Sequence, residues 1–143
     1  MAPSRAEPRW FLAKTEPGVY SIDHLQSDGE TSWDGVRNPQ AVRALRAMRP
    51  GDRVLIHHTG GSSAIVGVAV VTSEPSDDPK DPRSATVKLR YQCHVEPPVT
   101  LAEVKRTGLF ADFALVRQSR LSTMEVPSSF IDWLAEIRPA ILS

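Results

Sequence analysis

The chain has one cysteine and no long apolar run, and these absences exclude several kinds of protein. Because Cys93 is the single cysteine among 143 residues, an internal disulfide and a zinc site of several thiolates are both excluded. No apolar stretch approaches the roughly 20 residues of a membrane-spanning helix. Residues 1–8 lack the apolar segment of a secretion signal and are typical of a flexible leader. We therefore expect a soluble, cytoplasmic protein with no membrane partner.

Net charge is also absent. Lys+Arg and Asp+Glu each number 17, so the formal net charge is +0 and the pI is about 6.9. This balance argues against a protein that coats nucleic acid through bulk electrostatics, so any such contact must be local. One basic cluster occupies a short stretch with few acids: Arg37, Arg43, Arg46, Arg49 and Arg53. It is either a solvated helix face or a set of phosphate contacts.

The length is that of one ordinary domain, which we place at residues 9–143, after the leader at 1–8. Apolar and alternating runs predict strands, and capping residues with helical spacing predict helices. The expected strands are 9–13, 53–58, 64–72, 86–95 and 121–126. The expected helices are 22–26, 39–48, 101–106 and a closing helix from about 129, with a further helical turn in 109–115. This order predicts an α+β fold with a curved or closed sheet and flanking helices.

Several residues indicate where these elements begin and end. Asn38 is a suitable N-cap for a helix that begins at Pro39. The polar stretch 74–83 holds three prolines and is expected to be a loop, and Pro97-Pro98 is expected to end the preceding strand. Gly67 interrupts a β-branched run and indicates a bulge or a point of close approach.

The sequence offers no anchor for catalysis or for a metal. His57 and His58 are adjacent on a strand, so they point to opposite faces and cannot both bind one ion in the usual way. Gly60-Gly61 lacks the Lys-Ser/Thr of a phosphate-binding loop, and no serine has the surroundings of a nucleophile elbow. We therefore predict no enzyme activity, no cofactor and no metal site.

The segment 32–38, Ser-Trp-Asp-Gly-Val-Arg-Asn, is the strongest indication of a binding site. A planar polar ligand such as a nucleobase could stack on Trp33, meet an amide at Asn38 and place its phosphate near Arg37. Each residue also has a structural interpretation. Tryptophan in a loop is commonly a core residue, and Asn38 can serve its helix as a cap.

The motifs of this chain resemble those of the EVE domain family. Trp33 to Asn38, followed by Gln40-Ala41, is similar to the family's most characteristic motif, and the same order continues along roughly residues 9–138. The other matching segments are 14–17, 20–25, 51–52, 57–59, 65–67 and 115–122. The resemblance implies a PUA-like fold, which is a small β-barrel with flanking helices. It also implies kinship with YTH domains, hence a monomeric, non-catalytic reader of a modified base in DNA or RNA.

The candidate site follows partly from the residues and partly from that resemblance. The expected base pocket consists of Trp33, Val36, Asn38, His58 and Thr59, together with Lys14, Thr15, Leu121 and Ser122, which the resemblance places there. The expected backbone contacts are Arg37, Arg43, Arg46 and Arg120. Arg120 has an alternative role in an ion pair with Glu16 or Asp34. Pro39 and His57 depart from the common family pattern, in which an aromatic residue and a tyrosine are frequent.

Two other functions are compatible with the same residues. One is a PUA-like enzyme that hydrolyses a modified nucleoside, with Lys14 or Glu16 near the scissile bond. The other is a protein-interaction module in which Trp33 and Arg37 form the interface. Turnover of free nucleosides would indicate the first, and a concentration-dependent dimer would indicate the second.

Overall fold

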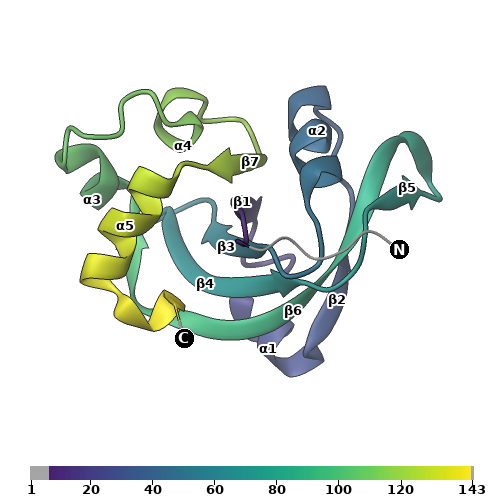
Figure 1. Cartoon of the computed structure of the whole chain (residues 1–143), viewed down its shortest axis with the longest axis horizontal. Coiled ribbons are helices and arrows are strands. Elements are labelled where there is room, and N and C mark those ends of the chain that lie inside the picture. The colour runs from purple at the N-terminus through teal and green to yellow at the C-terminus, as the bar shows by residue number, and fades with distance from the viewer. Residues whose placement is uncertain (1–6, 143) are drawn as a thin grey trace.

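The computed structural model describes residues 7–142 and has an α+β architecture built on one curved, seven-stranded sheet (Figure 1). The strands pair in the order β2-β6-β4-β3-β1-β7, and β5 adds to β6. The strands are β1 (Trp10–Thr15), β2 (Glu30–Trp33), β3 (Arg53–His58), β4 (Ala64–Val71), β5 (Ser76–Asp78), β6 (Asp81–Thr100) and β7 (Thr123–Val126). β1 and β3 are parallel, and the other pairs are antiparallel. Of the expected leader, residues 1–6 lie outside the described residues.

The expected α+β class is confirmed. The expected closed barrel is not confirmed, because the sheet is open. Its two edges are β2 and β7, and no strand pairing joins them within residues 7–142. β2 was not expected as a strand, because its four residues are too few to show an alternating pattern. It nevertheless pairs with β6 in a regular register from Glu30 opposite Arg90 to Trp33 opposite Val87. The strand therefore places Trp33 at the open edge.

β6 is much longer than predicted, because Pro97-Pro98 does not end it. The ladder between β4 and β6 passes from Ile65 opposite Val99 to Gly67 opposite His94, so β6 contains extra residues there. Prolines are tolerated in such a bulge, because no ladder hydrogen bond is required of them. The predicted loop 74–83 was also wrong in part, since β5 and the start of β6 form a hairpin within it.

The helices are α1 (Ile22–Asp28), α2 (Pro39–Ala47), α3 (Leu101–Arg106), α4 (Ala114–Arg117) and α5 (Ser128–Ile137), followed by the 3-10 turn η1 (Pro139–Leu142). Figure 1 shows α3, α4 and α5 gathered at one end of the molecule, and α2 at the other end beside the β5–β6 hairpin. The Asn38 cap is confirmed, because its side-chain oxygen accepts hydrogen bonds from the amides of Gln40 and Ala41 at 2.8 and 3.2 Å. No helix in residues 7–142 is long and apolar enough to cross a membrane.

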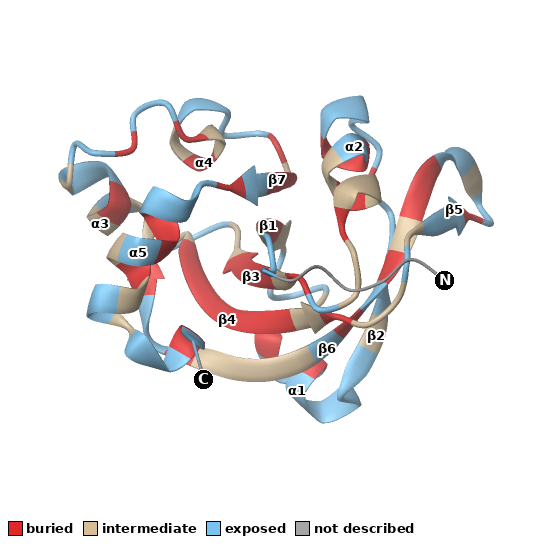
Figure 2. Cartoon of the chain, in the orientation of Figure 1, coloured by how far each residue is buried: buried red, intermediate tan, exposed pale blue. Residues whose placement is uncertain are grey.

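The core lies on the inner face of the curved sheet and beneath the helices (Figure 2). β4 is buried along almost its whole length, as its β-branched run predicted. Gly67 marks both a register shift and a close approach, as expected. A Cβ atom at Gly67 would lie 2.3 Å from Cδ1 and 2.6 Å from Cγ1 of Ile22, so α1 packs directly on the strand. This contact positions the chain that leads from α1 into β2.

Candidate functional site

A cavity of about 520 Å³ lies where the sheet is open. Its wall brings together the end of β1, the edge strand β2, the loop to α2 and the start of β7. The lining residues are Lys14, Thr15, Val19, Tyr20, Thr31, Ser32, Trp33, Asp34, Gly35, Val36, Arg37, Ser122 and Thr123. Because pockets for small ligands usually measure about 300–1,000 Å³, the space is large enough for a single nucleobase. The open seam of the sheet thus supplies a concave site.

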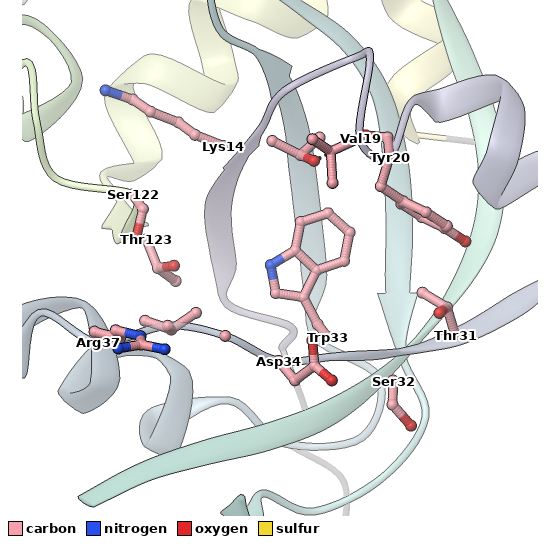
Figure 3. A pocket seen from close by; sticks show the side chains of 13 residues that line it. Lys14, Val19, Tyr20, Thr31, Ser32, Trp33, Asp34, Arg37, Ser122 and Thr123 are labelled. Carbon is pink, nitrogen blue, oxygen red and sulfur yellow. Dashed lines mark hydrogen bonds between the residues drawn. The ribbon is translucent and has the colours of Figure 1, made fainter. Parts of the chain in front are cut away.

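Trp33 lies at the centre of this wall (Figure 3). The residue belongs to the core and is 9% exposed, and it lines the cavity as well. Tyr20 stands edge-on to it, with ring centroids 6.1 Å apart and planes at 82°. The hydroxyl of Tyr20 donates to Asp28 Oδ2 at 2.8 Å, which fixes this second ring. The result is a corner of two aromatic rings at the cavity.

The loop between β2 and α2 forms the next part of the wall. Gly35 has φ of 76°, a conformation that favours glycine and turns the chain toward α2. Val36 is buried, and its carbonyl accepts a hydrogen bond from the Ser84 hydroxyl. Asn38 lies beyond the cavity wall, with its side-chain oxygen engaged by the start of α2. Its observed role is therefore that of a cap.

Lys14, Thr15 and Ser122 line the cavity together. The Lys14 amide donates to the Ser122 carbonyl at 2.8 Å, which holds β1 beside the start of β7. The ammonium group of Lys14 donates to the Ser119 carbonyl at 2.9 Å, and partial burial lowers its pKa. The Thr15 hydroxyl donates to the Tyr20 carbonyl at 2.8 Å. These hydrogen bonds hold the part of the cavity wall formed by β1 and the start of β7 in a fixed position.

Besides Asn38, three of the expected pocket residues do not line the cavity within residues 7–142: His58, Thr59 and Leu121. His58 is engaged elsewhere, because its Nε2 accepts a hydrogen bond from the Ile22 amide at 3.1 Å. The Thr59 amide donates to the Thr15 carbonyl at 3.0 Å, so this residue supports the wall from behind. Leu121 is a buried core residue. His58 and Thr59 were expected at the cavity from their place at a strand end, and Leu121 from the family resemblance.

The basic cluster divides between two places. Arg37 lines the cavity and also a second one, of about 430 Å³, together with Arg43 and Arg46. Arg46 is held by Asp77 Oδ1 and by the Ser84 carbonyl, both at 2.9 Å, so it ties α2 to the β5–β6 hairpin. Arg83, which sequence reasoning did not select, lines the second cavity as well. Arg120 is exposed and lines neither cavity.

Sequence reasoning missed several wall residues, above all Tyr20 and Thr123. The sequence does not show that Tyr20 lies beside Trp33, because α1 separates the two residues along the chain. Thr123 follows directly after Ser122, and its place at the start of an edge strand gave no local signal. A nearby buried polar group, His57, has no hydrogen-bond partner for either ring nitrogen within the described chain, and burial lowers its pKa to about 4.

The fold and the site define an α+β protein whose curved sheet holds a ligand-sized cavity in its open seam. The model of the EVE domain family matches residues 9–137, and the chain belongs to that family. The resemblance read from the sequence motifs is thereby confirmed.

Relatives and solved structures agree with this membership. Thymocyte nuclear protein 1 of Rattus norvegicus is 25% identical over 163 residues, which cover 95% of this chain and 72% of that protein. The solved structure of Rpa0253 from Rhodopseudomonas palustris is 34% identical, with a TM-score of 0.85 and coverage of 92% of this chain and 93% of that one. Human THYN1 protein in complex with 5-methylcytosine containing DNA has a TM-score of 0.80 at 24% identity, with coverage of 90% and 96%. At that identity the likeness shows a common fold.

Proposed function

We propose that this chain binds DNA that carries a modified base, and that the base enters the cavity between β2 and β7. The observation that carries the proposal is the position of Trp33, an indole on the wall of a cavity of about 520 Å³. The human relative solved with 5-methylcytosine containing DNA supports DNA as the polymer and 5-methylcytosine as the first mark to test. A base reaches such a cavity only when it rotates out of the duplex.

The proposed pocket combines two aromatic rings, several polar side chains and one exposed apolar side chain, Val19. Trp33 and Tyr20 form the corner, where contact with an aromatic ring contributes roughly 1 to 3 kcal/mol per base. Lys14, Thr15, Val36 and Ser122 remain the proposed pocket residues around it. Val19 lines the cavity although it is 75% exposed, and a bound base would cover this apolar side chain. Asn38 acts through the α2 cap that holds the loop in place.

The DNA backbone is proposed to pass from the cavity mouth toward α2. Arg37 lines both cavities, and Arg43 and Arg83 line the second one, where Arg83 also pairs with Asp81 at 3.3 Å. Arg46 contributes by holding the hairpin, because Asp77 already neutralises its charge. Arg120 remains a predicted contact without a neighbour in either cavity.

Binding without chemistry is the favoured mechanism. The hydrolytic alternative places Lys14 or Glu16 near the scissile bond, and the Lys14 ammonium group is engaged by the Ser119 carbonyl. An interface centred on Trp33 is disfavoured, because only 9% of that residue is exposed. The monomeric state and the cytoplasmic location remain predictions.

The direct test is a titration of DNA duplexes that differ only in one central base, cytosine or 5-methylcytosine, followed by fluorescence anisotropy. We expect tighter binding to the methylated duplex and weaker binding to RNA of the same sequence. Equal affinity for both duplexes would contradict recognition of this mark. Release of a product from modified nucleosides, followed by chromatography, would favour the hydrolytic alternative.

The matched variant is Trp33→Phe. Trp33→Ala is less informative, because truncating a buried tryptophan costs roughly 3 to 5 kcal/mol and threatens the fold itself. Trp33→Phe retains an aromatic ring and loses the indole nitrogen and part of the wall, so affinity should fall while the fold persists. Trp133→Phe, in α5 at the other end of the molecule, is the control and should bind normally. If both Trp33→Phe and Trp33→Ala bind the methylated duplex as tightly as the wild type does, the indole does not contact the base.

A further inference from the structure

Thr123, the first residue of β7, has a buried hydroxyl group without a hydrogen-bond partner in the described chain. The residue is 1% exposed and is the register partner of Ala13 in β1. Buried hydroxyl groups in folded proteins nearly always have a partner, since an unpaired one loses its bonds to water without replacement. The exception at Thr123 therefore needs an explanation.

The position of Thr123 supplies that explanation, because the residue lines the cavity beside Trp33. The other buried groups without a partner, the two ring nitrogens of His57, do not share this location. Figure 3 shows the Thr123 hydroxyl on the side of the residue that faces Trp33. No group of the described chain bonds this hydroxyl, so a ligand polar atom that enters the cavity beside it would meet no competing protein partner.

The indole nitrogen of Trp33 completes the arrangement. It has no hydrogen-bond partner among residues 7–142, and in Figure 3 it lies on the edge of the ring that faces Thr123. Two other polar groups of the wall are engaged by the protein: the Thr15 hydroxyl bonds the Tyr20 carbonyl, and the Lys14 ammonium group bonds the Ser119 carbonyl. Two free polar groups thus face one space from opposite walls.

We propose that Thr123 determines the specificity of the cavity by forming a hydrogen bond to the polar edge of the bound base, with the Trp33 N–H group as the second contact. The inference rests on the proposed function and names the residue that reads the base within it. An indole N–H can only donate, whereas a threonine hydroxyl can donate or accept. The ligand edge must therefore offer an acceptor to Trp33, and it can offer either a donor or an acceptor to Thr123.

The test is Thr123→Val, which keeps the β-branched shape and removes the hydroxyl. Two results are expected. The affinity for the duplex with one 5-methylcytosine falls about tenfold, the size of effect that one lost hydrogen bond to a ligand produces. The melting temperature of the free protein stays the same or rises, because an unpaired polar group has left the interior. A residue with only a structural role would not show this combination.

Two variants serve as controls. Thr123→Ser keeps the hydroxyl and should bind within about threefold of the wild type, well inside the tenfold effect expected of the valine. Ser129→Ala removes an exposed hydroxyl of α5, outside the cavity lining, and should bind normally. If circular dichroism shows that Thr123→Val is unfolded, Thr123→Ala replaces it, and its affinity for the methylated duplex is compared with that of Thr123→Ser.

The outcomes separate this inference from the proposed function. Wild-type affinity of folded Thr123→Val, with weakened binding of Trp33→Phe, would overturn the role of Thr123 and leave the proposed function intact. Equal losses for Thr123→Val and Thr123→Ser would also overturn it, because the hydroxyl would then not be the determinant. If the wild-type protein binds none of the duplexes, both proposals fail together.

Discussion

His57 of β3 is the register partner of Lys14 of β1, so a buried imidazole lies on the strand beside a lysine that lines the cavity. His57 is 2% exposed, and neither ring nitrogen has a hydrogen-bond partner within residues 7–142. Burial lowers its pKa from 6.5 to about 4, with a smaller contribution from the positive charge of Lys14. The folded protein therefore holds this ring in its neutral form near pH 7.

A specific pH dependence of stability follows. Between pH 6.5 and about 4 the unfolded chain binds a proton at His57 that the folded chain does not, so the free energy of unfolding decreases as the pH falls. The contribution of His57 is about 3 kcal/mol over this window and does not change further below it. Urea unfolding of wild type and His57→Leu at several pH values measures the difference, and the variant should show the shallower dependence.

His24→Gln is the control for this measurement. His24 is exposed, and its ring accepts the Ser21 amide in the capping box of α1, a role that glutamine also fills. This variant removes an exposed imidazole and keeps His57, so it should keep the steep pH dependence of the wild type. If His57→Leu loses stability with pH as steeply as the wild type does, His57 is not held neutral by the fold.

Much of the fold was predictable, because the relevant signals are local. The β-branched run of β4 and the Asn38-Pro39 start of α2 each lie in neighbouring residues. β2 and β5 were missed, because strands of four and three residues carry no periodicity. Pro97-Pro98 was read as the end of β6, since the sequence does not reveal the bulge opposite β4 that accommodates it.

The candidate site was predictable only where its residues follow one another in the chain. Trp33, Val36 and Arg37 were selected together, and they do share one cavity. Thr123 meets them because β7 and β2 are the two edges of one curved sheet, a relation between residues about ninety positions apart that no local pattern carries. His58 was expected at the pocket from its strand end, but it does not line this cavity, and its ring accepts a hydrogen bond from the Ile22 amide.

Gly67→Ala should destabilise the protein through one contact. The added Cβ would lie 2.3 Å from Cδ1 of Ile22, and the carbonyl of Cys93 is 3.0 Å away on the same strand pair. Overpacking of this kind costs roughly 1 to 3 kcal/mol. Gly18→Ala is the matched control, because no atom lies within 4 Å of the new Cβ, and it should leave the stability unchanged. Denaturant unfolding measures both variants.

The clash at Gly67 also predicts a coupling. In an Ile22→Ala background, which removes both of the nearest atoms, Gly67→Ala should cost clearly less than it does in the wild type. A double-mutant cycle from urea unfolding gives the coupling energy. Additive effects of the two substitutions would show that α1 does not pack against this point of β4.

Substitutions of Asn38 distinguish its role as a helix cap from a role in contacting the ligand. Asn38→Ala removes the acceptor of the Gln40 and Ala41 amides and should lower the free energy of unfolding by about 1 kcal/mol. Asn38→Asp restores an acceptor and should restore stability. If the cap is the main role, Asn38→Asp also binds the methylated duplex normally. A stable Asn38→Asp with strongly reduced affinity would instead assign the amide to the ligand.

Arg37 is predicted to contact DNA phosphate, and salt dependence distinguishes this contact from a merely structural role. Arg37 is exposed at the junction of the two cavities, so Arg37→Gln should leave the fold intact and weaken binding similarly for methylated and unmethylated duplexes. The slope of log affinity against log salt concentration should decrease by about 1, since one counterion fewer is released. Arg106→Gln removes the same charge from exposed α3 and should change neither affinity nor slope. A salt slope that is equal in wild type and Arg37→Gln would exclude Arg37 from the DNA interface, whatever the change in affinity.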